Sequence, residues 1–121
     1  MTECEDDLFC GVNYADKDPE DMDTLEKKHT PFLEVQRTED GSYEVTVKVG
    51  VYKEHPNEHN HFIQEIELYS GRTFLGRAYF ASGRTDPEAT FVVNPEHKHP
   101  LVAFERCNLH GTWRSKEVEL E

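Results

Sequence analysis

Apolar and polar residues alternate along most of the chain after residue 31. The clearest case is residues 43–52, where valine occupies every second position from 45 to 51 and polar residues fill positions 44, 46 and 48. Side chains of a strand point alternately to its two faces, so this pattern predicts a strand with one buried face. Residues 32–39 form a second plausible strand, and Asp40-Gly41 between the two is a hairpin signal.

Five more short strands are expected after this hairpin, at residues 61–69, 73–80, 90–93, 101–106 and 112–120. Polar stretches with Gly, Pro or Asn separate the apolar runs at intervals of roughly 8 to 12 residues, and no segment has a convincing helical period. Short strands at this spacing are typical of an immunoglobulin-like fold. We therefore expect an all-β protein, a seven-stranded antiparallel β-sandwich.

The first residues of the chain have a different composition. Residues 1–24 are rich in Asp and Glu and contain few apolar anchors, which predicts an extended, partly mobile acidic arm. Residues 25–31 are read as an exposed turn, because Pro31 disfavours a helical conformation at Thr30. We expect two parts, an acidic N-terminal arm at 1–24 and one β-sandwich domain at 25–121.

The charge and the cysteines narrow the class of protein. The formal net charge of −12 opposes binding to phosphate backbones or anionic lipid, so neither nucleic acid nor membrane is an expected partner. No run of about 18 apolar residues occurs, and the N-terminus is acidic where a signal peptide would be basic, so a cytoplasmic protein is expected. Cys4, Cys10 and Cys107 do not make an even disulfide framework and would stay thiols there.

A candidate metal half-site lies near the C-terminus. Cys107 and His110 are separated by two residues and followed by Gly111, a residue that favours a tight turn. A thiolate is a strong, soft ligand, and an imidazole three positions later can reach the same ion if the chain turns between them.

Seven histidines could supply partners: His29, His55, His59, His61, His97, His99 and His110. Turns at one end of a sandwich lie close together whatever their order in the sequence, so His29, the loop from His55 to His61 and the turn at His110 can meet. His59 is expected on the other side of its loop. His97 and His99, in a charged turn, are expected to be solvated. Four imidazoles, one thiolate and an open position suit redox-active iron better than zinc.

Three motifs carry a resemblance to a known family. They are Glu-Lys-Lys-His-Thr-Pro (26–31), His-Pro-x₄-His-Phe-Ile (55–63) and Cys-Asn-Leu-His-Gly-Thr-Trp (107–113). Together and in this order they resemble the superoxide reductase family, also called neelaredoxin or, with an extra domain, desulfoferrodoxin. The likeness runs from about residue 25 to residue 121. It implies an immunoglobulin-like β-sandwich with one iron, bound by four equatorial histidines, His29, His55, His61 and His110, and by the axial Cys107.

The resemblance also has limits. Cys4 and Cys10 lack the spacing of the cysteine-rich rubredoxin-like domain that some members carry, so a one-iron form is implied. Family members often have a glutamate two positions before the first histidine, as a sixth ligand of the ferric state. That position is Lys27 here, and Glu26, one residue earlier, is the candidate for this role. Lys28 matches the family lysine directly before the histidine.

The implied activity is the one-electron reduction of superoxide to hydrogen peroxide, as an antioxidant defence. Electrons would come from rubredoxin or a similar small redox protein, and the family forms dimers and tetramers, so a homo-oligomer is implied. Lys28 is the expected catalytic residue, because it can attract the anion and orient a water that delivers protons. Lys27 and Lys28 would supply a local positive patch on an acidic protein.

Two other functions are compatible with the sequence. His59, His61 and Glu65 match the His-x-His-x₃-Glu core of cupin metal sites, which would make the protein a dioxygenase or isomerase that does not use Cys107. No glycine stands six positions before His59, however, and no second cupin motif occurs around His110. The third hypothesis is a non-catalytic sandwich that binds a partner through its acidic surface, with the histidines as surface residues.

Overall fold

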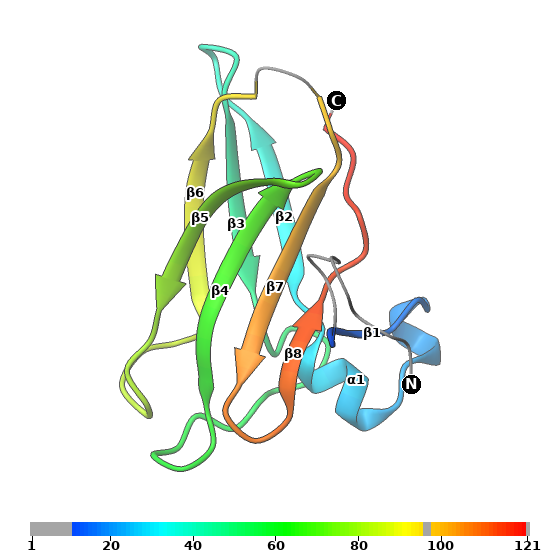
Figure 1. Ribbon diagram of the computed structural model, residues 1–121, viewed down its shortest axis with the longest axis vertical. Coiled ribbons are helices and arrows are strands. Elements are labelled where there is room, and N and C mark those ends of the chain that lie inside the picture. Colours follow the sequence, from blue (N-terminus) through cyan, green and yellow to red (C-terminus); the bar gives the residue numbers. More distant parts are fainter. Residues whose placement is uncertain (1–10, 96–97, 121) are drawn as a thin grey trace.

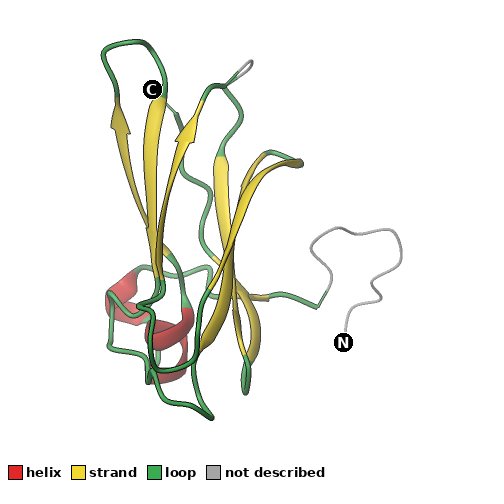
Figure 2. Cartoon of the chain, turned by 90° about the vertical axis from the view of Figure 1, so that its left-hand side faces the viewer, coloured by secondary structure: helices red, strands yellow, loops and turns green. Residues whose placement is uncertain are grey.

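Two β-sheets pack face to face in the computed structural model of the chain, which describes residues 11–95 and 98–120 (Figures 1 and 2). The five-stranded sheet has the order β1-β8-β7-β4-β5 and the three-stranded sheet the order β2-β3-β6. The strands are β1 (Asn13–Tyr14), β2 (Phe32–Arg37), β3 (Tyr43–Lys48), β4 (Ile63–Ser70), β5 (Thr73–Tyr79), β6 (Glu88–Val93), β7 (Leu101–Cys107) and β8 (Gly111–Arg114). All neighbouring strands are antiparallel except β1 and β8.

This architecture confirms the predicted β-sandwich. Each of the seven predicted strands occurs, from β2 to β8, and β2 and β3 form the expected hairpin. The last strand is shorter than predicted: β8 ends at Arg114, and the chain beyond it makes only an isolated bridge, between Val118 and Leu101. The sequence prediction did not contain β1.

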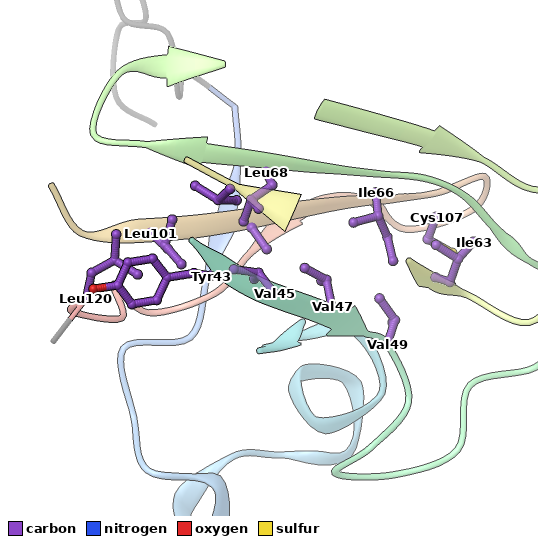
Figure 3. Close-up of a cluster of buried hydrophobic side chains, with 12 residues drawn as sticks. Tyr43, Val45, Val47, Val49, Ile63, Ile66, Leu68, Leu101, Cys107 and Leu120 are labelled. Carbon is purple, nitrogen blue, oxygen red and sulfur yellow. The ribbon is translucent and has the colours of Figure 1, made fainter. Parts of the chain in front are cut away.

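The core lies between the two sheets (Figure 3). Val45 and Val47 of β3 are completely buried, as their alternation predicts, and Ile66 and Leu68 of β4 face them from the other sheet. Val51 was expected on the same face, but it is exposed because β3 ends at Lys48 and the chain turns away. The apolar contacts between the sheets fix their separation, and so the positions of the loops at their ends.

One strand contains an irregularity that the alternation does not reveal. The pairing of β4 with β7 shifts register between Ile63 and Glu65, so Ile63 and Ile66 are both buried although they are three positions apart. Regular alternation along residues 61–69 would put Phe62 on the same face as Ile66 and Leu68, but Phe62 is only half-buried. A bulge of this kind turns the start of β4 toward the preceding loop.

The expectation of no helix is wrong for one short segment. Thr24–His29 forms the α-helix α1, where an exposed turn was predicted. A capping box begins it: the Asp23 side chain accepts a hydrogen bond from the Glu26 N–H, and the Glu26 side chain accepts one from the Asp23 N–H. The helix ends at His29 because Thr30 is extended, as the proline that follows it requires.

The described part of the acidic N-terminal segment lies against the sandwich. Asn13 and Tyr14 of β1 pair in parallel with Trp113 and Arg114 of β8, and Ala15 and Met22 are buried. A 3₁₀ turn, Pro19–Asp21, precedes α1. The predicted boundary of the arm at residue 24 stays a prediction, and Cys4 and Cys10 lie outside the described residues. Within the described ranges, no helix is long and apolar enough to cross a membrane.

Candidate metal centre

The predicted ligands meet at one end of the sandwich, the lower end in Figure 1. The ligand atoms of His29, His61, Cys107 and His110 all lie within 4.8 Å of one another. His55 joins them: its Nε2 lies 3.2 Å from Nε2 of His29 and 3.5 Å from Sγ of Cys107. The tertiary structure therefore brings together the five residues that the sequence proposed from three separate segments.

The four imidazoles are arranged as a closed cycle. Neighbouring ring centroids are 4.7 Å apart for His29 and His55, 4.8 Å for His55 and His61, 5.1 Å for His61 and His110, and 4.9 Å for His110 and His29. All four contacts are edge-to-face. The Sγ atom of Cys107 lies 3.7 Å from Nδ1 of His110, so the sulfur belongs to the same group of donor atoms.

Backbone carbonyls determine which ring nitrogen faces the centre. Nδ1–H of His29 donates to the carbonyl oxygen of Leu25 at 2.7 Å, one helical turn earlier in α1, and Nδ1–H of His55 donates to the carbonyl oxygen of Pro56 at 2.6 Å. With Nδ1 protonated, each Nε2 carries a lone pair and no hydrogen. In metal-binding histidines, the ring nitrogen that does not bind the metal typically donates a hydrogen bond of this kind, which orients the ring.

This arrangement fits a bound cation. Two Nε2 lone pairs, of His29 and His55, face each other at 3.2 Å, and no hydrogen lies between them to join them. Nε2 of His61 is buried and has no hydrogen-bond partner among the described residues. Buried polar atoms are costly when unpaired, and a metal ion at their common centre would satisfy all three nitrogens.

Burial keeps the histidines ready for a metal. It lowers the pKa of His29 and of His61 and lowers that of His55 to about 4, so all three are neutral at pH 7. Burial raises the pKa of the Cys107 thiol, while the backbone N–H groups of Leu109 and His110 act in the opposite direction. A metal ion must therefore displace a proton from Cys107, and those two N–H groups stabilise the resulting thiolate.

The turn that carries the thiol is short and closed. Cys107 is the last residue of β7 and pairs with Gly111, the first residue of β8. Gly111 has a φ of 80°, in the left-handed region that glycine adopts without strain, as its place after the motif suggested. Cys107 itself is buried, whereas His110 lies on the exposed side of the turn.

Sequence reasoning missed the role of Asn108. Its Nδ2 donates to the carbonyl oxygen of Asn60 at 2.9 Å, and its Oδ1 accepts from the N–H of Phe62 at 2.9 Å. These bonds tie the ligand turn to the loop on both sides of His61. Trp113, the last residue of the third motif, contacts His29 and the backbone of His110. The position of both residues inside the third motif was the available signal.

The two other predicted residues lie on α1, next to the cluster. Lys28 directly precedes His29 in α1, and its positive charge adds to the effect of burial in lowering the pKa of His29 and of His61. Oε1 of Glu26 accepts hydrogen bonds from the Asp23 N–H at 3.0 Å and from Nζ of Lys17 at 2.9 Å. These contacts give the Glu26 carboxylate a capping role.

The cupin hypothesis finds no support in the geometry. His59 is exposed, with Nδ1 3.5 Å from the hydroxyl of Ser82, and Glu65 forms an ion pair with Arg77 at 3.2 Å. Neither belongs to a group of potential metal ligands among the described residues. His99 lies beside Ser70 at the end of β4, where its carbonyl oxygen accepts a hydrogen bond from Oγ of Ser70 at 3.2 Å. His97 lies outside the described residues.

A β-sandwich that gathers four imidazoles and one thiol at one end of its sheets belongs, by fold and site, to the class of proteins that could hold a metal ion there. Its sequence matches the family model of desulfoferrodoxin over residues 21–116. The chain belongs to the desulfoferrodoxin family, and this confirms the family that its motifs resembled.

Individual relatives agree with this membership. A putative superoxide reductase of Methanocaldococcus jannaschii is 40% identical over 119 residues, which cover 93% of this chain and 97% of that protein. The superoxide reductase of Pyrococcus furiosus is 38% identical, with 78% of this chain and 90% of that protein covered. The solved structure of the superoxide reductase (neelaredoxin) from Archaeoglobus fulgidus, in the reduced form, has a TM-score of 0.73 at 34% identity and covers 91% of this chain and 98% of its own.

Proposed function

We propose that this chain is a superoxide reductase that uses a single iron to convert superoxide to hydrogen peroxide. The observation that carries the proposal is the convergence of five donor atoms, in a chain whose relatives include named superoxide reductases. The reaction adds one electron and two protons to superoxide, and a bound iron would supply the electron. The residues that would hold it are His29, His55, His61, His110 and Cys107.

The protein's own residues prepare this site. Neutral imidazoles would leave most of the positive charge of a bound metal uncompensated, which would favour the approach of an anion, and the single thiolate would donate electron density to the metal. The amide N–H groups of Leu109 and His110 moderate that donation through hydrogen bonds to the sulfur. Because His110 and Leu109 are exposed, solvent and substrate have access to this end of the molecule.

We assign to Lys28 the role of attracting superoxide and orienting a water that delivers protons. The chain carries a net charge of −12, so attraction of an anion requires local positive charge, which Lys27 and Lys28 provide at the end of α1. One such charge contributes about 2–3 kcal/mol at a spacing of about 6 Å and an effective dielectric constant of about 20.

The test of Lys28 is the second-order rate constant for superoxide, measured against ionic strength in Lys28→Ala and in the wild type. We expect a lower rate constant and a weaker dependence on salt in the variant. Arg72→Ala is the matched control, since Arg72 is an exposed cation in the turn between β4 and β5, at the end of the sandwich away from the candidate ligands. An unchanged rate in Lys28→Ala would remove Lys28 from the mechanism.

Glu26 is not included in the proposed ligand set. Its carboxylate already accepts two hydrogen bonds at the start of α1, so its coordination of the ferric ion stays a prediction from the sequence. Glu26→Gln separates the two roles. We expect the visible spectrum of the oxidised protein to be unchanged; a shifted band would identify Glu26 as a ligand.

Turnover requires an external electron donor, and a small rubredoxin-like redox protein is the proposed partner. It would dock at the metal end, where Leu109 lies between two ligands in sequence and is 60% exposed. Leu109→Asp would then slow reduction of the oxidised protein by rubredoxin and leave its reduction by dithionite unchanged. Equal effects with both reductants would argue against docking at this turn.

The remaining proposals concern the whole chain. A homo-oligomer, dimer or tetramer, is supported by the exposed aromatic residues Phe74 and Tyr79 on β5, a strand at the edge of its sheet. Light scattering after gel filtration would test it, with Tyr79→Lys expected to weaken the association.

The cytoplasm is the proposed location, since it keeps the three cysteines reduced.

The central experiment is metal analysis and visible spectroscopy of the purified protein. We expect about one iron per chain and, after mild oxidation, a thiolate-to-ferric charge-transfer band that disappears in Cys107→Ser. Cys10→Ser is the control and should keep the band. A band that survives Cys107→Ser would overturn the assignment of Cys107 as a ligand. Absence of bound iron would overturn the proposed site and favour a binding module instead.

A further inference from the structure

Trp113 contacts two of the proposed ligands at once. It is the single tryptophan of the chain, lies in β8 and is only 6% exposed. Its indole stacks on the imidazole of His29 with ring centroids 5.0 Å apart and planes inclined by 21°. Its Nε1–H donates to the carbonyl oxygen of His110 at 3.0 Å. One side chain therefore joins α1, which ends at His29, to the turn that carries His110.

The stacking fixes a degree of freedom that the other contacts of His29 leave open. The hydrogen bond from its Nδ1 to Leu25 holds one edge of the imidazole, but a ring held at one edge can still tilt about that bond. The neighbouring imidazoles meet His29 edge-to-face, and among the described residues the indole is the stacked ring that covers its face. Contacts from residues that do not bind the metal themselves commonly set the orientation of a metal ligand.

The indole also favours one charge state of a bound metal. An imidazole that binds a cation takes up part of the positive charge, and it takes up more from a ferric than from a ferrous ion. The face of an indole carries a negative quadrupole and attracts positive charge more strongly than the other aromatic side chains do. Stacked on His29 in a buried place, it therefore stabilises the ferric form relative to the ferrous form.

We propose that Trp113 is a positioning residue of the metal centre, which holds the plane of His29 and the backbone of His110 and shifts the iron toward its ferric state. The part that concerns iron rests on the proposed function, whereas the positioning part applies to any metal ion bound by these ligands.

Two substitutions separate the two contacts. Trp113→Phe keeps a stacked ring and removes the Nε1–H donor, and Trp113→Leu removes both. Phe104→Leu is the matched control, because Phe104 is a buried aromatic residue of the adjacent strand β7 that packs on Tyr69, away from the ligands. The readouts are the rate at which a chelator extracts Zn²⁺ or iron, and the ferric fraction at a fixed ambient potential.

We expect Trp113→Leu to release Zn²⁺ and iron about 10- to 100-fold faster than the wild type, the usual effect of losing such a supporting contact. Its ratio of ferric to ferrous iron should fall by about two- to tenfold. Trp113→Phe should keep most of that ratio and release metal with an intermediate rate, and Phe104→Leu should match the wild type in both readouts.

Wild-type release rates together with an unchanged ferric fraction in Trp113→Leu would overturn the proposal. If Trp113→Leu does not fold, an unchanged Zn²⁺ release rate in Trp113→Phe overturns the role of the Nε1–H bond. A wild-type protein that binds Zn²⁺ but no iron would count against the proposed function alone, because the Zn²⁺ release rates would still test whether Trp113 positions the ligands.

Discussion

Glu105 shows how a single residue can oppose the stability of the fold. It is 1% exposed on β7, and neither carboxylate oxygen has a hydrogen-bond partner among the described residues. Along this strand Leu101, Ala103 and Cys107 belong to the core cluster, and the alternation of the strand places Glu105 on the same face. Burial raises its pKa well above the ordinary value, because an apolar environment without partners disfavours the charged form.

The pKa of Glu105 leads to a prediction about stability and pH. The pKa of this carboxyl group is higher in the folded protein than its ordinary value of 4.5. The free energy of unfolding is therefore highest below pH 4.5, and it falls as the pH rises from 4.5 toward the pKa of the folded state. Glu105→Gln, which cannot ionise, should raise the free energy of unfolding of the metal-free protein at pH 7 by about 1–3 kcal/mol. Urea denaturation at pH 4 and pH 7 measures the difference.

The difference between Glu105→Gln and the wild type should shrink toward pH 4, where the unfolded wild-type chain is also protonated at this position. Glu119→Gln, at an exposed position near the C-terminus, serves as the control and should not change the free energy of unfolding. Equal stability of Glu105→Gln and the wild type at pH 7 would contradict the prediction.

At the scale of elements, the metal centre depends on how two loops are joined. The turn between β7 and β8 and the loop before β4 come from distant parts of the sequence, and Asn108 connects them by its side-chain bonds to Asn60 and Phe62. Asn57 makes similar bonds on the far side of the same loop, to Gly83 and Thr85. The loop that carries His55 and His61 is therefore held from both sides.

These two asparagines allow a matched comparison. Asn108→Ala removes the contact to the ligand turn and should accelerate extraction of the metal by about tenfold or more, because His61 loses its support. Asn57→Ala removes equivalent bonds to a loop without ligands and should have a smaller effect. Chelator kinetics measure both variants. An equal acceleration in the two would mean that the loop needs general rigidity and that the link to the ligand turn has no special role.

The start of α1 offers a second test at this scale. Asp23→Ala removes the capping side chain of a six-residue helix and should lower the free energy of unfolding by about 1 kcal/mol. Since the helix ends at His29, we also expect faster release of the metal. Asp40→Ala, a change of the same kind in the hairpin between β2 and β3, controls for general destabilisation. A normal release rate in Asp23→Ala would show that α1 is held by packing alone.

For the whole molecule, the metal-free protein contains buried histidines that resist protonation. The unfolded chain protonates a histidine near its ordinary pKa of 6.5, whereas His55 in the folded protein does so only at about 4. Between these values the unfolded state binds more protons, so the stability of the folded state falls as the pH decreases. His29 and His61 change in the same direction.

We therefore expect the metal-free protein to lose stability as the pH falls from about 6.5 to about 4. Thermal unfolding across this range measures the loss. His55→Gln should reduce the dependence on pH, and the exposed His59→Gln should leave it unchanged. Bound metal should raise the midpoint of unfolding at neutral pH, since it binds only the folded state. If the stability of His55→Gln depended on pH as strongly as that of the wild type, His55 would not be a source of this pH dependence.

The sequence alone was enough to predict the class of fold, the family and the five candidate ligands. Alternation of period two identified β2 to β8, because the pattern of buried side chains in a half-buried strand is local. The five candidate ligands came from the resemblance of three short motifs to the superoxide reductase family, and short motifs can be read without the fold. What the alternation could not show was the bulge after Ile63, since an extra residue in a strand has no distinctive composition.

Only the tertiary structure decided how these residues act on one another. The helix α1 was missed because six residues give too short an apolar pattern, although Asp23 and Glu26 have the spacing of a capping box in the sequence. The cycle of four imidazoles, the stacking of Trp113 on His29 and the burial of Glu105 all join segments that are far apart in the chain. Such contacts depend on how two sheets pack, and packing is a property of the whole chain that no local pattern records.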